Sequence, residues 1–340
     1  MTSRMLVEAR EAPAAVARQL AADWAAYASL GTDLRERPPA AMLTIARGSS
    51  DHAAHYFAYL VMARLGRLVT SLPMSLITLY QSRLVCDGLA SFAFSQSGQS
   101  PDLVAPTQFF RSGGARTIAF VNDATSPLAR AAQWVFSLHA GVEASVAATK
   151  SYIGQLVAGA RVVAQWQADT RLLAALQALP PVLERAAQQD WAPAVEALRD
   201  AGHLFVIGRG TGLAIAMEAA LKLKETCGIQ AEAFSGAEVQ HGPMALVDDG
   251  FPLLVFAPRG PAQPGLLALA DGMRARGARV LLAAPLGTPD CDLPLMETAA
   301  EELDPIAAIQ SFYPMVEALA RARGFDPDRP RNLAKVTRTR

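Results

Sequence analysis

Short apolar runs alternate with amphipathic stretches along most of the chain. The runs are rich in branched and aromatic residues, end at small or polar residues, and occupy 41–46, 91–94, 117–121, 203–207, 253–257 and 280–284. Between them, apolar residues recur at helical spacing in 102–111, 213–226 and 266–276. Runs of this kind are typical of buried parallel strands, and their alternation with helices predicts a parallel sheet covered on both faces. We therefore expect an α/β protein of three layers that binds ligands where its strands end.

Three landmarks of the first half of the chain recur in the second half. The pairs are 47–48 with 209–210, 94–98 with 256–260, and 114–116 with 277–279. The first two pairs have an offset of 162 residues and the third has an offset of 163. The constant order and spacing predict a duplicated domain.

The remaining segments have helical character. Residues 8–30 are rich in alanine, and we expect Gly31 to end that helix. The stretch 150–200 predicts a helical connector, and Asp304-Pro305 predicts the start of a long helix. The expected domains are an N-terminal helical segment 1–34, a first copy 35–165, a connector 166–194, a second copy 195–325 and a tail 326–340. A tail that contains two prolines would ordinarily be frayed.

Composition and charge narrow the class of protein. Hydrophobic residues make up 51% of the chain and charged residues 18%, which excludes a disordered protein. The 31 basic and 31 acidic residues balance, so no global field favours nucleic acid or an anionic membrane as partner. Three scattered cysteines suggest neither a zinc site nor disulfides. No apolar run has the length of a signal peptide or a membrane span, and the sequence predicts a soluble cytoplasmic protein.

The most informative segment is Ser-Gln-Ser-Gly-Gln-Ser-Pro at 95–101, which follows a predicted strand and precedes a helix. Serine hydroxyls and backbone N–H groups at a helix N-terminus favour a bound phosphate, and Gly98 would let the backbone approach that ligand. A plain capping turn explains the same residues equally well. Ser49 and Ser50, after the first strand, either add hydroxyls to the same crevice or cap the next helix.

Two other classes of site are disfavoured. The glycines at 208–212 do not form a dinucleotide fingerprint, because Leu213 stands where the third glycine belongs and no Walker lysine follows. We therefore expect no nucleotide or nicotinamide cofactor. Asp51, His52 and His55 are a weak metal signal on a helix surface, and we predict no metal site.

Glu218, Lys222 and Glu225 are spaced i, i+4 and i+7 on one face of a predicted helix. They form either an exposed Glu–Lys pair worth a few tenths of a kcal/mol or, because the flanking residues are strongly apolar, a buried set that includes a general base. His241 lies in a loop dense in glycine, proline and acidic residues.

Five motifs, in their order along the chain, carry a family resemblance. They are Ser-Gln-Ser-Gly at 95–98, Ala-Ala-Thr-Lys at 147–150, Ala-Leu-Lys-Leu-Lys-Glu at 220–225, His-Gly-Pro at 241–243 and Arg-Asn-Leu-Ala-Lys at 331–335. Together they resemble the sugar-isomerase (SIS) double-domain family over nearly the whole chain. That family includes the isomerase half of glutamine–fructose-6-phosphate aminotransferase and stand-alone glucosamine-6-phosphate deaminases. The resemblance implies two tandem SIS domains, each a flavodoxin-like parallel sheet flanked by helices.

The resemblance also assigns roles to residues of this sequence. Glu225 would move a proton between C1 and C2 of a sugar phosphate, His241 would assist ring opening, often from a neighbouring subunit, and Lys335 would form or stabilise an imine. Lys222 would support the site, as the neighbouring cation that favours an uncharged Lys335. The substrate-binding residues expected from the serine loops and the resemblance together are Ser49, Ser50, Ser95, Gln96, Ser97, Ser100, Val146 and Ala334.

Some positions depart from the synthase pattern. Gln99 stands where the synthases usually have glutamate, and Arg47 and Ser49 stand where they tend to have cysteine and threonine. The Ser-Gly-Gln-Ser-Pro form looks more like the stand-alone SIS enzymes. The sequence begins with Met-Thr, and we therefore expect no glutaminase that uses a terminal cysteine.

The resemblance implies an enzyme without a cofactor that converts glucosamine 6-phosphate to fructose 6-phosphate and ammonia. An aldose–ketose isomerase, a fructosamine-6-phosphate deglycase, a glutaminase-less aminotransferase-like protein and a non-catalytic sugar-phosphate sensor stay open. The expected partners are a hexose or hexosamine phosphate and, because His241 would act across an interface, a second copy of the chain in a homodimer.

Overall fold

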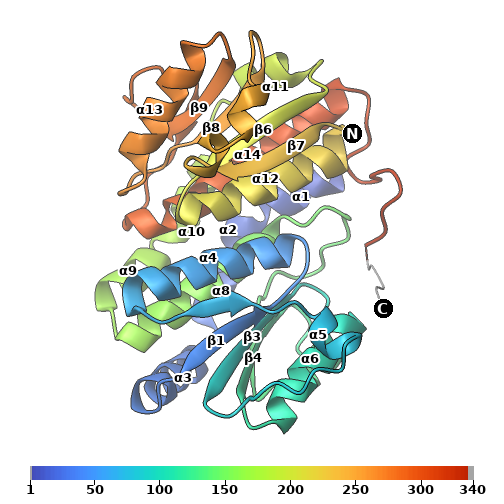
Figure 1. Cartoon of the computed structure of the whole chain (residues 1–340), viewed down its shortest axis with the longest axis vertical. Coiled ribbons are helices and arrows are strands. Elements are labelled where there is room, and N and C mark those ends of the chain that lie inside the picture. Colours follow the sequence, from blue (N-terminus) through green and yellow to red (C-terminus); the bar gives the residue numbers. More distant parts are fainter. Residues whose placement is uncertain (1, 336–340) are drawn as a thin grey trace. The chain divides into compact units, whose positions relative to one another are not determined.

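The computed structural model describes residues 2–335, which form two compact units, each built on its own parallel sheet (Figure 1). The first-sheet unit contains residues 14–143 and 150–177 together with Ala334 and Lys335, and the second-sheet unit contains residues 2–13, 144–149 and 178–333. Met1 of the predicted N-terminal segment and 336–340 of the predicted tail lie outside the described residues. No helix within 2–335 is both long and apolar enough to cross a membrane.

The first-sheet unit has five parallel strands in the order β2-β1-β3-β4-β5. The strands are β1 (Ala41–Ile45), β2 (Val69–Ser71), β3 (Leu89–Ser95), β4 (Arg116–Val121) and β5 (Trp134–Ser137). The helices, of which α2 starts in the other unit, are α2 (Ala12–Ala21), α3 (Trp24–Glu36), α4 (Ser49–Leu65), α5 (Ser75–Thr78), α6 (Pro101–Ser112), α7 (Pro127–Ala131), α8 (Lys150–Gln167) and α9 (Thr170–Gln177).

Strand β3 shows why its sequence is continuously apolar. Successive side chains point to opposite faces of a sheet. Phe92 and Phe94 face α4, where the ring of Phe57 lies 4.7 and 5.7 Å from theirs, centroid to centroid. Ala93 faces the other way and packs in a cluster with Phe110 of α6. Because both faces are covered, neither set of alternating positions is polar.

The second-sheet unit repeats this architecture with strands in the order β10-β9-β8-β6-β7. The strands are β6 (His203–Gly208), β7 (Gln230–Ser235), β8 (Pro252–Phe256), β9 (Arg279–Pro285) and β10 (Leu293–Leu295). The helices are α1 (Arg4–Arg10), α10 (Leu179–Ala186), α11 (Ala192–Leu198), α12 (Thr211–Cys227), α13 (Gln263–Arg274) and α14 (Asp304–Ala322), with short 3-10 turns η1 (Glu238–Gln240), η2 (Pro243–Leu246) and η3 (Glu301–Leu303). Ile207, Val255 and Leu266 lie in one buried cluster between the sheet and α13.

The two sheets confirm the predicted duplication and the α/β fold class. Counted from β2 and from β7, the strands follow the same order in both sheets. The first strand–helix turn is also the same, because Gly48 (φ 54°, ψ −133°) and Gly210 (φ 64°, ψ −134°) precede helices of 17 residues each. A positive φ at this turn favours glycine.

The N-terminal helix prediction was wrong in two respects. The predicted helix 8–30 is divided among α1, α2 and α3, and Asp23, with a left-handed φ of 55°, stands between α2 and α3. Gly31 does not end a helix but lies inside α3. A Cβ at Gly31 would lie 2.6 Å from the carbonyl oxygen of Gln165 in α8, so the missing side chain lets these two helices pack closely.

The strands that the sequence pattern missed are the four at the sheet edges, β2, β5, β7 and β10. β2 and β7 are largely half-buried or exposed, and β10 has only three residues. An edge strand with little buried surface needs no apolar run.

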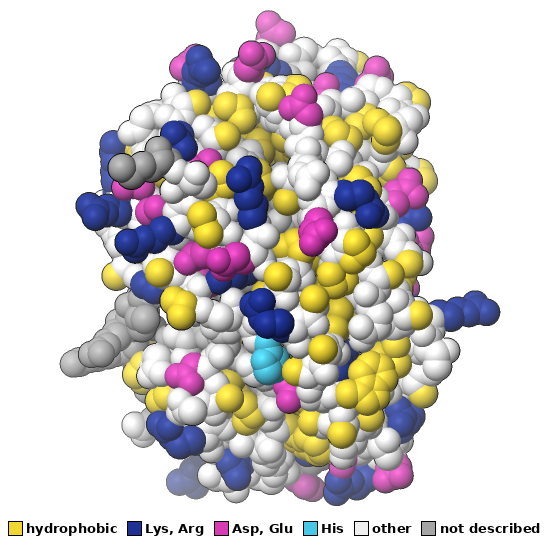
Figure 2. All heavy atoms as spheres, turned by 180° about the vertical axis from the view of Figure 1, so that it is seen from behind, with side chains coloured by type: hydrophobic (Ala, Val, Ile, Leu, Met, Phe, Trp, Pro, Cys, Tyr) yellow, Lys and Arg dark blue, Asp and Glu magenta, His cyan; other side chains and the backbone are white. Residues whose placement is uncertain are grey.

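Charge is spread without a dominant sign on the face of the molecule shown in Figure 2. Lys and Arg side chains are interspersed there with Asp and Glu side chains. With a net charge of zero, the chain supplies no long-range field for an anion. An anionic ligand must therefore be held by local hydrogen-bond donors.

Candidate active site

The serine loop borders a pocket of about 320 Å³ in the first-sheet unit, at the carboxyl ends of β1 and β3. Its lining residues are Arg47, Gly48, Ser50, Phe94, Ser95, Gln96, Ser97, Ser100, Asp102, Leu103 and Lys335. We call it the serine pocket. It brings together five of the predicted substrate-binding residues and the predicted lysine. Ser49 is not among its lining residues; it is the first residue of α4.

The capping interpretation does not account for these serines. Ser100 occupies the N-cap position of α6, but its side chain makes no capping hydrogen bond. Ser49 and Ser50 lie inside α4, whose N-cap residue is Gly48.

Three serine hydroxyls of the pocket lining each accept a hydrogen bond from the protein. The Ser95 Oγ accepts a hydrogen bond from the backbone N–H of Gly98 at 2.9 Å, and the Ser97 Oγ accepts one from the N–H of Gln99 at 3.3 Å. The Ser50 Oγ accepts one from Nε2 of Gln155 at 2.9 Å. A hydroxyl that already accepts from the protein still has its O–H to donate, so three hydroxyls favour an anion. Gln155 is buried and was missed by sequence reasoning.

Gly98 is also required by a contact within the protein that the sequence did not reveal. It has a left-handed φ of 63°, and a Cβ there would lie 2.2 Å from Ser126 Oγ. The close approach is thus to the protein's own Ser126, the N-cap residue of α7.

Gly98→Ala should therefore weaken binding of inorganic phosphate at least about tenfold, because both the φ and the contact with Ser126 would force the loop to move. Isothermal titration measures the change. Gly88→Ala is the matched control, since Gly88 also has a positive φ (72°) but a Cβ there would meet its nearest neighbour at 3.9 Å. Equal phosphate affinity in the two variants would contradict this account of the loop.

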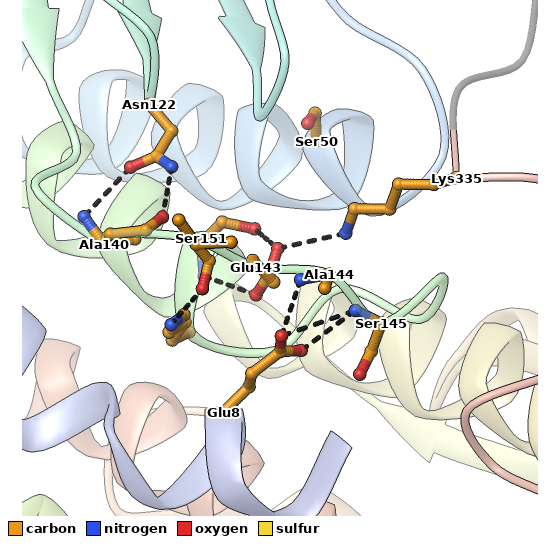
Figure 3. Close-up of polar contacts among 12 residues, drawn as sticks. Glu8, Ser50, Asn122, Ala140, Glu143, Ala144, Ser145, Ser151 and Lys335 are labelled. Atoms are coloured by element: carbon orange, nitrogen blue, oxygen red, sulfur yellow. Dashed lines mark hydrogen bonds and ion pairs between the residues drawn. The ribbon is translucent and has the colours of Figure 1, made fainter. Parts of the chain in front are cut away.

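Lys335 lies beside a buried carboxylate that the sequence analysis did not identify. Its Nζ is 3.5 Å from Oε2 of Glu143, whose side chain is fully buried (Figure 3). Glu143 also accepts hydrogen bonds from the backbone N–H of Ser151, at 3.1 Å, and from the Ser151 hydroxyl. A charged side chain that contacts Lys335 within the first-sheet unit is thus an acid, Glu143. The cation that the sequence analysis expected to act on Lys335, Lys222, belongs to the second-sheet unit.

The acidic and basic residues of α12 are buried. Lys222 is 1% exposed and contacts Oε1 of Glu218 at 3.5 Å and, more closely, Oε2 of Glu225. Glu218 is fully buried, whereas the Glu225 side chain keeps 18% of its surface. The interpretation as an exposed pair was wrong, and the one carboxylate of the set with access to solvent is the predicted base.

Glu225 borders a second pocket, of about 470 Å³, in the second-sheet unit. Its lining residues are Leu221, Lys224, Glu225, Thr226, Gly228, Phe325, Asp326, Arg329, Pro330, Arg331 and Leu333. We call it the Glu225 pocket. Burial lowers the pKa of the Lys224 amine on its wall.

The tail that forms one wall of the Glu225 pocket is held by specific contacts, not frayed. The Asp328 carboxylate accepts hydrogen bonds from the backbone N–H groups of Arg4 and Met5 at 2.8 and 2.9 Å, at the start of α1. The guanidinium of Arg331 stacks on the ring of Phe325 at 4.7 Å. The tail lines the Glu225 pocket as far as Leu333 and the serine pocket at Lys335, so it contributes to both.

Besides Ser49 and Lys222, three predicted residues lie outside both pocket linings. His241 is exposed and follows η1, next to Gly242 with its φ of 134°. Val146 is half-buried in the 144–149 segment, where the Glu8 carboxylate accepts hydrogen bonds from the N–H groups of Ala144 and Ser145 (Figure 3). Ala334 is exposed.

The weak metal signal on α4 gains no support. Over the described stretch 2–335, no group of three His, Cys, Asp or Glu side chains is placed to hold a metal ion. Burial raises the pKa of the Asp51 carboxyl and lowers that of the His55 imidazole, so both shifts favour uncharged forms.

The rarity of lysine is a feature of the sequence that the sequence analysis did not use and that marks residues of both pockets. The chain has 27 arginines but four lysines, at 150, 222, 224 and 335. Two of them, Lys150 and Lys222, are buried, and Lys224 and Lys335 line the two pockets. Lysine is therefore kept where an amine has a specific partner.

Comparison with known sequences identifies the family of the chain. The SIS domain matches residues 38–164 and 197–284. A glutamine–fructose-6-phosphate aminotransferase (isomerizing) from Aeropyrum pernix is 37% identical over 318 residues, which cover 87% of this chain and 50% of that protein. The chain thus spans about half the length of the curated relatives it matches.

Solved structures show the same fold. A candidate phosphosugar isomerase from Silicibacter pomeroyi is 43% identical, with a TM-score of 0.91 over 96% of this chain and 100% of that one. A glucosamine-6-phosphate deaminase from Thermotoga maritima is 19% identical with a TM-score of 0.79, over 99% of this chain and 100% of that one, a likeness of fold alone. With the SIS domain matched over both sheets, the chain belongs to the SIS domain family.

Proposed function

We propose that the chain is a phosphosugar enzyme that converts glucosamine 6-phosphate and water to fructose 6-phosphate and ammonia. The observation that carries this proposal is the serine pocket, whose hydroxyls at positions 50, 95 and 97 each accept a hydrogen bond and retain an O–H group for a ligand, while Lys335 lies on its wall. Its Aeropyrum relative is named for fructose 6-phosphate and an amino-group transfer, which supports a hexosamine phosphate as substrate.

The proposed reaction begins with ring opening, in which His241 transfers the proton of the C1 hydroxyl. An imidazole can both accept and donate a proton, which suits this step. Glu225 then removes the proton from C2 and returns it to C1, which converts the amine at C2 to an imine. In the net reaction, water supplies the oxygen at C2 and the nitrogen leaves as ammonia.

Lys335 is the proposed partner of that imine. Its amine must lose a proton before it attacks the C2 carbon, and Glu143, 3.5 Å away, is the acceptor that we assign to this proton. The exchange expels the substrate nitrogen as ammonia and leaves an imine between Lys335 and C2. Water hydrolyses this imine to fructose 6-phosphate and the free amine, and the same carboxylate returns the proton.

The expected domains are part of the same proposal. Residues 35–165 would bind the phosphate, residues 195–325 would carry Glu225 and His241, and the tail from 326 would carry Lys335. His241 would act in the site of a second subunit, which makes the proposed enzyme a homodimer.

A substrate panel tests the function. We expect the purified full chain to release ammonia and fructose 6-phosphate in equal amounts from glucosamine 6-phosphate. Interconversion of glucose 6-phosphate and fructose 6-phosphate without ammonia would identify an isomerase instead, and turnover confined to fructosamine 6-phosphate would identify a deglycase. Calorimetric binding of these sugars with no product over hours would identify a sensor, and any of these three results overturns the proposal.

A further inference from the structure

Arg47 is a residue of the serine pocket that the proposed reaction does not use. It follows β1 and lines the pocket together with Ser97 and Ser100. Its side chain is 58% exposed, so the guanidinium is open to solvent and to a ligand.

A buried acid holds this guanidinium in place. Nε of Arg47 donates a hydrogen bond to Oδ2 of Asp102 at 3.1 Å. Asp102 is 5% exposed and lies in the first turn of α6, two residues after Ser100. The ion pair therefore holds the Arg47 side chain beside the N-terminus of α6, where the serine loop ends.

The remaining edge of the guanidinium has no hydrogen bond within residues 2–335, although the Asp51 carboxylate at the start of α4 is close enough to interact with it electrostatically. Of the contacts made by residues 2–335, Arg47 has a hydrogen bond at Nε and none at Nη1 or Nη2. These terminal nitrogens carry four N–H donors in a fixed plane, an arrangement that matches two oxygens of a phosphate group.

The charge of a phosphate group favours a cation among the donors of the serine pocket. A phosphate monoester carries close to two negative charges at neutral pH, whereas the serines and Gln96 of the pocket are uncharged. The other cation of the lining, Lys335, faces the carboxylate of Glu143. Arg47 also has a carboxylate partner, Asp102, but that contact is made at Nε, so Nη1 and Nη2 can still bring charge-assisted donors to the phosphate.

We propose that Arg47 binds the phosphate group through Nη1 and Nη2 and makes the serine pocket selective for its doubly charged form. The inference rests on the proposed phosphosugar function and adds a residue that determines its specificity. Asp102 is the positioning residue, since it presents the fork without touching the ligand.

The test is calorimetric binding of inorganic phosphate and of glucosamine 6-phosphate to the full chain. A charge-assisted hydrogen-bonded pair of this kind corresponds to a loss of about 10- to 100-fold in affinity, and we expect that loss in Arg47→Ala. Arg47→Lys should recover part of it, because an ammonium supplies charge without the fork. Arg83→Ala, at an exposed arginine of the same unit outside the pocket lining, should bind like the wild type.

The charge state of the ligand gives a second readout. The phosphate group of a sugar phosphate gains its second charge near pH 6 and inorganic phosphate gains it at a somewhat higher pH, whereas sulfate is doubly charged throughout. Phosphate affinity relative to sulfate should therefore rise from pH 5 to pH 8 in the wild type, and this rise should shrink in Arg47→Ala. If Arg47 only supported the packing of α6 against β1, Arg47→Ala would lower the melting temperature. The ratio of phosphate affinity to sulfate affinity would then rise with pH as much as it does in the wild type.

The binding experiments distinguish a wrong role for Arg47 from a wrong proposed function. If Ser95→Ala and Ser97→Ala lose phosphate affinity while Arg47→Ala keeps it, the inference is wrong and the serine pocket stands. If none of these variants, nor the wild type, binds phosphate or the sugar phosphate, the proposed function falls and the inference with it.

Discussion

Glu225→Gln is expected to lower kcat for ammonia release by about 10²- to 10⁴-fold, the usual contribution of a positioned general base. Glutamine keeps the size of the side chain and a carbonyl oxygen for Lys222, but it cannot accept the C2 proton. Because the substitution leaves the serine pocket untouched, KM and the calorimetric affinity for the sugar phosphate should change little. Such a split between kcat and KM is the signature of an interaction made in the transition state.

The matched control for this substitution is Glu232→Gln, an exposed glutamate on the neighbouring β7. It removes one negative charge from the same unit and should keep full turnover. If Glu225→Gln retained wild-type kcat, Glu225 could not be the group that moves the proton, and the mechanism would need another base.

Lys222→Met should destabilise the protein by about 3–5 kcal/mol, the cost of breaking a buried ion pair. The variant would leave Glu218, which is fully buried, and Glu225 on one helix face without the amine that lies between them. Urea denaturation followed by circular dichroism measures the loss as a lower midpoint at unchanged slope.

Two further variants make the stability result specific. Lys224→Met, on the same helix but partly exposed at the Glu225 pocket, should lose less than about 1.5 kcal/mol, the contribution of its hydrogen bond to the carbonyl of Ala231. Adding Glu218→Gln to Lys222→Met should recover part of the loss, since one uncompensated carboxylate is removed. A Lys222→Met protein as stable as the wild type would show that these carboxylates need no cation.

The sequence predicted those parts of the fold that leave a pattern in consecutive residues or in a repeat along the chain. Apolar runs that end at small or polar residues predicted the central strands. The nearly constant offset between the two copies predicted the duplication, and the shared backbone geometry of Gly48 and Gly210 agrees with it. The edge strands were missed because half-exposed strands need no apolar run. Gly31 was misread because its function, the close approach to Gln165, depends on a residue far along the chain.

The candidate site divides in the same way. The serine loop was found because its residues are contiguous and stand between a strand and a helix. Glu143 and Gln155 were missed because each acts through another side chain, on Lys335 and Ser50, and no spacing along the chain reports such a pair. Arg47 entered only as a departure from a family pattern, and its link to Asp102, 55 residues later, emerged only in three dimensions.

The duplicated fold has kept different chemistry in each copy. At the offset of 162, Leu60 and Ala63 of α4 correspond to Lys222 and Glu225 of α12, so the first copy lacks the acid and the amine. Ser97 corresponds to Arg259, which is tied to Asp304 at 2.7 Å, so the second copy lacks the hydroxyl loop.

This asymmetry bears on how such a protein evolves. When affinity and rate depend on separate repeats, a mutation in one repeat alters one property with little penalty in the other. If the proposed division of roles holds, substitutions in the first repeat would change which sugar phosphate binds, while the second repeat keeps the groups that move the proton.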